Sequence, residues 1–156
     1  MITQEEVMQF FCRAMFAGFA GGNEPTPDTT QPGSGWMYHQ YYEGTLALRD
    51  QWLTGPGSDF SSGVTTIYEA SVPVWCMAYQ GWYKPSAIVM LKAALRQNYE
   101  QGIFLGGRGP WVFNRDALVY YNNPTGNLSD FSGMESIWNC TTQEMLGKHW
   151  YRGFWF

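Results

Sequence analysis

Ser58-Asp59-Phe60-Ser61 and Ser129-Asp130-Phe131-Ser132 are the same four residues, placed 71 positions apart in a chain of 156 residues. Their surroundings match as well, since Tyr79-Gln80-Gly81 aligns with Tyr151-Arg152-Gly153 once a gap of one residue is allowed. Internal repetition at a long period is the sequence sign of a structure built from copies of one unit. The repeat therefore predicts two similar units in this chain.

Patterns typical of β-strands occur in pairs around short turns in each half of the chain. Between residues 72 and 80, for example, Val74, Cys76 and Ala78 alternate with Trp75, Met77 and Tyr79, which is the two-residue period of a strand. Strands joined by short turns pair antiparallel, so each half should form an antiparallel unit of four strands. The ranges with this character are 36–43, 46–53, 65–70 and 72–80 in the first half and 111–114, 117–122, 134–139 and 144–154 in the second.

Two helices are expected beside these strands. Thr3-Gln4-Glu5-Glu6 has the form of a capping box, and the apolar residues that follow recur at helical spacing until Gly21-Gly22. Pro85-Ser86 starts a second helical pattern over 86–101. Residues 23–35 hold three prolines and no periodicity, so an ordered loop is expected there.

The predicted fold class is α+β, with two similar antiparallel four-strand β units and with the N-terminal and central helices packed on the sheet. A single domain over residues 1–156 is expected, because a chain of this length can enclose one substantial core. The repeat units cover about 36–82 and 108–154, with the helix over 86–101 between them.

The composition favours a protein that covers or uses many aromatic rings. Aromatic residues make up 18% of the chain, charged residues only 14%, and the formal net charge is −4. Nucleic-acid binding is not expected, because the nine Lys and Arg residues are scattered and form no basic cluster. No signal peptide and no apolar run of membrane-spanning length is present, and three cysteines cannot all pair, so we expect a cytoplasmic protein with reduced thiols and no membrane association.

Motifs for catalysis, metals and cofactors are missing from the sequence. His39 and His149 are the only histidines, too few for a metal site without a cysteine pair. There is no GxSxG motif, and the glycine-rich segments 33–35 and 106–109 lack phosphate-binding spacing, so they are interpreted as hinges. No cofactor and no metal are expected, and an enzyme is less expected than a binding protein.

Glu135 is the most notable acid, because it begins a predicted strand in apolar surroundings. Burial there would raise its pKa or require a cation such as Arg49, Arg108 or Arg152, in a structural ion pair or in a functional site. Arg49 and Asp50 are adjacent on a predicted strand and must point to opposite faces.

Aromatic side chains beyond those needed for the core could line a pocket at the junction of the two units. Flat rings together with one arginine and one acid suit a planar ligand such as a nucleobase or another heteroaromatic metabolite. The predicted ligand-binding residues are Tyr41, Arg49, Trp75, Tyr79, Glu135, His149 and Tyr151.

Several short motifs along the chain carry a resemblance to a known family. They are Phe10-Phe11-Cys12-Arg13-Ala14, Ala17-Gly18, Ala20-Gly21-Gly22, Pro32-Gly33-Ser34, Glu43-Gly44, Arg49-Asp50, Phe60, Gly63, the run 73–81, Arg108-Gly109-Pro110 and Phe131-Ser132-Gly133-Met134-Glu135. With these residues the whole chain resembles an uncharacterised bacterial family known as a domain of unknown function, some members of which follow a helix-turn-helix regulator domain. The family pattern places a carboxylate two residues after a glycine in both halves, whereas this chain has Thr65 in the first half and Glu135 in the second. The resemblance implies a sensor module without its DNA-binding domain.

Three functions remain open from the sequence. The first is a non-enzymatic small-molecule-binding domain, a sensor or a sequestering protein, with an aromatic-lined pocket for a planar ligand. The second is a protein-interaction or homodimerisation module that covers the excess rings. The third is an enzyme that uses Glu135 and a histidine as acid and base.

Overall fold

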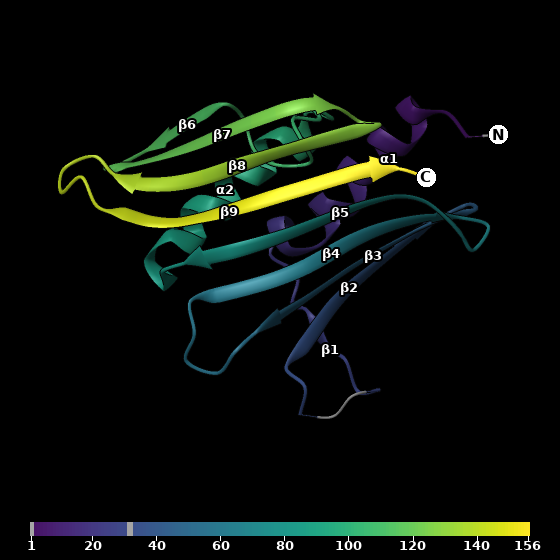
Figure 1. Ribbon diagram of the computed structural model, residues 1–156, viewed down its shortest axis with the longest axis horizontal. Coiled ribbons are helices and arrows are strands. Elements are labelled where there is room, and N and C mark those ends of the chain that lie inside the picture. The colour runs from purple at the N-terminus through teal and green to yellow at the C-terminus, as the bar shows by residue number, and fades with distance from the viewer. Residues whose placement is uncertain (1, 31–32) are drawn as a thin grey trace.

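The computed structural model describes residues 2–30 and 33–156, which form one antiparallel sheet with helices on one of its faces (Figure 1). The helices and strands, in chain order, are α1 (Gln4–Ala17), the 3-10 helix η1 (Phe19–Gly21), β1 (Thr26–Pro27), β2 (Trp36–Glu43), β3 (Leu46–Thr54), β4 (Phe60–Glu69), β5 (Val72–Tyr83), the 3-10 helix η2 (Pro85–Ala87), α2 (Ile88–Glu100), β6 (Val112–Arg115), β7 (Leu118–Asn127), β8 (Asp130–Asn139) and β9 (Met145–Trp155).

The sheet joins two four-stranded units through their last strands. Its strand order is β1-β2-β3-β4-β5-β9-β8-β7-β6, and every neighbouring pair is antiparallel. Strands β2–β5 form one unit and β6–β9 the other, so an approximate two-fold axis runs between β5 and β9. This confirms the predicted α+β class with two antiparallel units, an N-terminal helix and a central helix.

The structural alignment of the two units differs by one residue from the alignment given by the four-residue match. Tyr79 lies opposite Gly63 in the first unit, and Tyr151 lies opposite Gly133 in the second. In this register Ser61, not Phe60, is the counterpart of Phe131. A shift of one residue turns a strand side chain to the other face, and Phe60 is accordingly 65% exposed while Phe131 is 2% exposed.

Strands β4 and β8 begin earlier than predicted, because Gly63 and Gly133 lie inside them, each beneath a tyrosine ring of the neighbouring strand. A Cβ atom on Gly63 would lie 2.5 Å from the Tyr79 ring, and one on Gly133 would lie 2.4 Å from the Tyr151 ring. Both tyrosine rings therefore cross the neighbouring strand where a side chain is missing. The glycines, which weaken a strand prediction, here allow the strand to continue beneath a ring.

The N-terminal segment follows its prediction at the start and departs from it at the end. The Thr3 hydroxyl accepts from the Glu6 amide at 3.2 Å, and the Glu6 carboxylate accepts from the Thr3 amide at 2.8 Å, which completes the capping box. The α-helix ends at Ala17, short of Gly21-Gly22, because Gly18 leaves the helical conformation, and a 3-10 turn follows. A Cβ atom on Gly18 would lie 2.6 Å from the His39 ring, so glycine is required at this position.

The loop predicted over residues 23–35 contains one short strand. Thr26–Pro27 pairs with Tyr38 and Met37 at the edge of the sheet, where a proline is tolerated because the edge needs fewer amide donors. Gln31 and Pro32 of this loop prediction lie outside the described residues, and Pro32 also belongs to the family resemblance.

The core lies between the sheet and the helices. Phe11 on α1 packs edge-on against Trp75 of β5, and Trp75 stacks on Phe131 of β8 with ring centroids 5.7 Å apart. Trp75 and Phe131 are both buried, so rings from both units share one core. The opposite face of the sheet carries no helix among the described residues and leaves several apolar side chains exposed.

The Gly63 and Gly133 contacts predict the effect of adding a methyl group. Gly63→Ala should lower the free energy of unfolding by about 1–3 kcal/mol, because the new Cβ would also lie 2.6 Å from the Gln51 carbonyl oxygen, which is backbone. Gly55→Ala is the control, since its Cβ would meet only Ser58 at 3.5 Å. Urea unfolding followed by tryptophan fluorescence measures the difference, and equal losses in the two variants would contradict the packing role.

Candidate functional site

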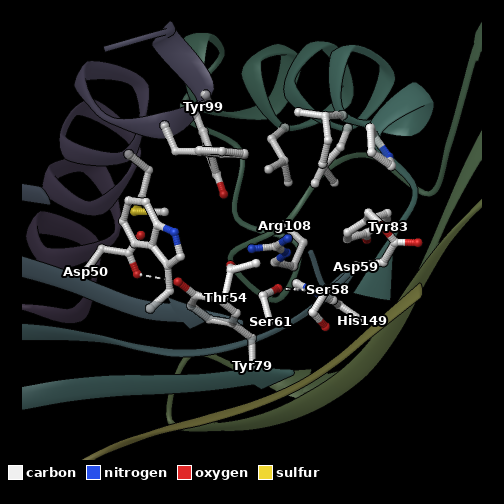
Figure 2. A pocket seen from close by; sticks show the side chains of 18 residues that line it. Asp50, Thr54, Ser58, Asp59, Ser61, Tyr79, Tyr83, Tyr99, Arg108 and His149 are labelled. Atoms are coloured by element: carbon white, nitrogen blue, oxygen red, sulfur yellow. Dashed lines mark hydrogen bonds between the residues drawn. The ribbon is translucent and has the colours of Figure 1, made fainter. Parts of the chain in front are cut away.

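A cavity of about 300 Å³ lies between the sheet and the helices, mainly over the first unit (Figure 2). Its floor is formed by strands β3, β4, β5 and β9, and its roof by α1, η1 and α2. The lining residues are Met15, Phe19, Ala20, Asp50, Trp52, Thr54, Ser58, Asp59, Ser61, Tyr79, Tyr83, Pro85, Ile88, Leu91, Leu95, Tyr99, Arg108 and His149.

The roof is apolar because of the spacing of residues on α2. Leu91, Leu95 and Tyr99 follow one another at intervals of four residues, which places them on the same face of the helix, and all are buried. The mouth lies where Thr54, Asp59 and neighbouring lining residues become exposed. The cavity therefore runs from an open polar mouth to a closed inner end under α2.

Asp50 is the acid at the inner floor of the cavity, and its side chain points inward from β3 (Figure 2). It is 4% exposed, and its Oδ1 accepts hydrogen bonds from the Thr65 hydroxyl at 2.8 Å and the Tyr79 hydroxyl at 2.9 Å. Burial raises the pKa of Asp50, against the opposing effect of those two hydrogen bonds. None of the ion pairs found among the described residues includes Asp50.

Arg108 enters the cavity from the other side and is held by Glu135. The Glu135 Oε1 accepts from Arg108 Nε at 3.0 Å, and Arg108 Nη2 makes a further close contact with the same oxygen. Tyr83 donates to Oε1 at 2.8 Å, and Tyr120 donates to Oε2 at 2.5 Å. Burial would raise the pKa of Glu135, but attraction to Arg108 and these hydrogen bonds outweigh it and lower the pKa. Glu135 is thus a fully satisfied buried carboxylate.

The segment that carries Arg108 is packed and anchored, which does not fit the hinge predicted for residues 106–109. The Tyr99 hydroxyl donates to the Gly107 carbonyl at 2.8 Å, and the Asn98 side chain donates to the Arg108 carbonyl at 3.0 Å. Gly106 and Gly107 have φ angles of +63° and +68°, and a Cβ on Gly106 would lie 2.6 Å from the Tyr151 ring. Glycine is needed here for a tight path beneath the helices.

The two units have polar side chains at corresponding positions, but the acidic residue is on a different strand in each unit. Asp50 lies opposite Thr65 in the first unit, and Asn122 lies opposite Glu135 in the second. Tyr79 donates to Asp50 Oδ1, and its counterpart Tyr151 donates to Asn122 Oδ1 at 2.6 Å. Each unit therefore has one buried acid, on β3 in the first and on β8 in the second.

His149 borders the cavity beside Tyr79. Its ring stacks near Tyr79 with centroids 5.9 Å apart, and its Nε2 lies 3.1 Å from the Ser61 hydroxyl. Burial, reinforced by the positive charge of Arg108, lowers the pKa of His149 to about 4. The ring is therefore neutral near pH 7.

The structure brings two of the seven predicted ligand-binding residues, Tyr79 and His149, into the lining of the cavity. Trp75, Glu135 and Tyr151 are buried and do not line it. Trp75 belongs to the aromatic core, and the other two belong to the polar network.

Tyr41 and Arg49 lie elsewhere. The Tyr41 ring packs against Phe10 with centroids 5.7 Å apart, away from the cavity. Arg49 points to the helix-free face, where it lies 3.5 Å from the Asp28 carboxylate and over the Tyr38 ring.

Sequence reasoning did not select Asp50 or Arg108 as ligand-binding residues. Asp50 lies between Leu48 and Trp52 at the spacing of inward-facing strand residues, so an acid in that row was an available signal. Arg108 was considered only as a partner of Glu135. Its position beside Asp50 depends on the path of the 105–110 segment, which has no periodicity from which to predict it.

Within residues 2–30 and 33–156, no group of three or more His, Cys, Asp or Glu side chains is arranged to hold a metal ion. Over the same residues, no helix has the length and apolar character needed to cross a membrane. Cys12, Cys76 and Cys140 are free thiols.

A family model described as "Domain of unknown function (DUF5680)" matches residues 55–154. The match covers more than half of the chain, which therefore belongs to this family. No curated protein and no solved structure matches the chain. The matched region includes Arg108, Glu135 and His149, whereas Asp50 and Trp52 on β3 precede it.

Asp50→Asn should raise the free energy of unfolding at about pH 8, because burial raises the pKa of Asp50 and the ionised carboxylate above that pKa destabilises the folded protein. The amide can keep both hydrogen bonds through its oxygen, as Asn122 does with Tyr151. The stability contributed by the protonated Asp50 carboxyl is complete below its ordinary pKa of 3.8 and is lost as pH rises through the raised folded value. The gain from Asn should therefore fade as the solution is acidified to about pH 4.

Urea unfolding of wild type and Asp50→Asn across this pH range measures the effect. Asp59→Asn, at the exposed mouth, is the control and should change stability by less than about 0.5 kcal/mol. A loss of stability for Asp50→Asn at every pH would contradict the unpaired state of the carboxylate.

Proposed function

We propose that this protein is a non-enzymatic small-molecule-binding domain, a sensor or a sequestering protein, that holds a planar ligand in the cavity beneath α2. The observation that carries the proposal is the cavity itself, with its volume of about 300 Å³, its mostly apolar lining and a few polar side chains among the rings of its floor. Ligand sites in proteins have this character, with mostly apolar walls and a few converging polar groups.

The rings around the cavity support a flat ligand. Trp52, Tyr79 and Tyr83 extend from the floor strands, and Phe19 lies on η1 at the side of the roof. Opposite them, Leu91 and Leu95 present broad aliphatic surface. An aromatic body between these walls would gain both dispersion contacts and burial of apolar surface.

The state of Glu135 favours binding over catalysis. Its two oxygens are occupied by Arg108, Tyr83 and Tyr120, and it is not part of the cavity lining. A general acid or base must reach the proton that it transfers, so Glu135 is poorly placed for that role. The proposal of an enzyme that uses Glu135 has less support than the proposal of a binding domain.

We extend the proposal to the setting of the protein. The resemblance to domains that follow helix-turn-helix regulators supports a sensor whose ligand state is passed to a regulator. Free thiols at Cys12, Cys76 and Cys140 support a reducing, cytoplasmic environment. The bacterial family resemblance supports a bacterial source.

Leu91→Trp tests the cavity as the site. A thermal-shift screen of nucleobases, nucleosides and heteroaromatic metabolites should yield compounds that stabilise the wild type, and Leu91→Trp should weaken their binding by at least about tenfold because the larger ring occupies the cavity.

The matched control is Val89→Trp, which places the same side chain on the 65% exposed surface of α2 and should leave binding unchanged. Leu95→Phe is a smaller change for use if Leu91→Trp does not fold. Absence of any stabilising compound, or unchanged affinity in a folded cavity variant, would contradict the proposed site.

A second candidate is association of two copies through the helix-free face of the sheet. Met134 and Trp150 lie opposite each other on β8 and β9 and are 39% and 45% exposed. Tyr121 and Phe154, on the same face, are 46% and 41% exposed. A patch of this kind beside the approximate two-fold axis would suit contact with an identical patch.

Trp150→Arg tests this candidate by placing a second charge beside Lys148 in the patch. The wild type should sediment as a dimer at high concentration and the variant as a monomer, because the charge would have to be desolvated at the contact. Val89→Arg, on the opposite side of the molecule, is the control. A wild type that stays monomeric at every concentration in sedimentation velocity would exclude this association.

A further inference from the structure

We propose that the ligand carries a cationic nitrogen group, such as an amidinium, a guanidinium or a protonated amine, that pairs with Asp50 at the inner end of the cavity. The inference rests on the proposed ligand-binding function and specifies the chemistry of the ligand. It comes from the charges that the fold buries around the cavity and from the group that each charge contacts.

The buried charges do not balance within the chain. Asp50 and Glu135 are 4% and 0% exposed, and Arg108, at 5%, is the arginine buried beside them. His149 is neutral near pH 7 and adds no positive charge. With both acids ionised, one negative charge is left without a cation of its own, which is costly in a low-dielectric interior.

Arg108 is committed to Glu135. It directs both Nε and Nη2 to Glu135 Oε1, and it makes no ion pair with Asp50 among the described residues. Its guanidinium carbon also lies 5.6 Å from the centre of the Tyr79 ring, so the ring borders it on the Asp50 side. Arg108 thus neutralises Glu135, the acid of the second unit, and leaves Asp50, the acid of the first unit, without an ion pair.

His39 is the other basic group near Asp50, and it forms no ion pair with it. The two residues are opposite each other on β2 and β3. The buried His39 Nε2 atom has no hydrogen-bond partner in the described residues. Asp50 therefore has donors from Thr65 and Tyr79 on one oxygen and no ion pair among the described residues. Burial raises the pKa of Asp50, although the charges of Arg108 and His39 oppose that rise.

The cavity provides the space for that cation. Asp50 lines it, and Asp59 at the mouth adds a second acid to the same lining. An anionic ligand would meet two acids and an arginine that is already paired, whereas a cation would complete the charge balance. The rings and leucines beside Asp50 would at the same time cover the flat body that carries the nitrogen.

Three probes on one ring system separate charge from shape: 2-naphthamidine as the cation, 2-naphthamide as the neutral form and 2-naphthoate as the anion. Binding to the full chain is measured by titration calorimetry and by quenching of tryptophan fluorescence. The wild type should bind the amidine at least about tenfold more tightly than the amide, and the naphthoate most weakly.

Asp50→Asn should remove this preference. The affinity for the amidine should fall by at least about tenfold, while that for the amide should change by less than about threefold. Asp116→Asn is the matched control and should keep the preference, because the Asp116 side chain is 90% exposed and lies outside the cavity lining.

Equal or tighter binding of the amide or the naphthoate by the wild type would overturn the inference and leave the proposed function standing. The same holds if Asp50→Asn keeps the preference for the amidine. If none of the three probes binds the wild type, the inference is overturned, and the proposed function is then decided separately by the wider screen and by Leu91→Trp.

Discussion

The ion pair between Arg108 and Glu135 is the contact on which the interior of this protein depends. It joins the segment after α2 to strand β8 beneath the helices, and Tyr83 and Tyr120 complete the hydrogen bonding of the carboxylate. Loss of one partner from such a pair leaves an uncompensated buried charge, which typically costs about 3–5 kcal/mol. The surface pairs, such as Arg152 with Asp130, have both side chains about 70% exposed and contribute little by comparison.

The same ion pair distinguishes the surroundings of the two buried acids. In the second unit, the chain itself supplies the cation for the buried acid, through the glycine-rich segment that brings Arg108 under α2. In the first unit, Asp50 faces a cavity in the corresponding region. The space beside the acid of the second unit is thus filled by an arginine of the chain itself, whereas the space beside Asp50 is open.

Much of the fold was accessible from the sequence. Strand alternation and the capping box gave the order of helices and strands, and the glycine and tyrosine pairs at Gly63 and Gly133 preserve the repeat. The four-residue match was displaced by one residue from the true register. Identical residues such as Phe60 and Phe131 can lie on opposite faces of the sheet, because the face that a side chain occupies depends on the register of strand pairing and not on residue type.

The site was accessible only in part, for a physical reason. The sequence by itself determined the α+β class and the alternation that puts Asp50 on the same strand face as Leu48 and Trp52. It also determined an excess of aromatic side chains that must be covered by the core, a ligand or a partner. Only the tertiary structure decided that Arg108 turns toward Glu135, that Arg49 points away, and that the space over Asp50 stays open. Periodicity fixes which face of a strand a side chain occupies, whereas the pairing of distant charges depends on how loops without periodicity bring them together.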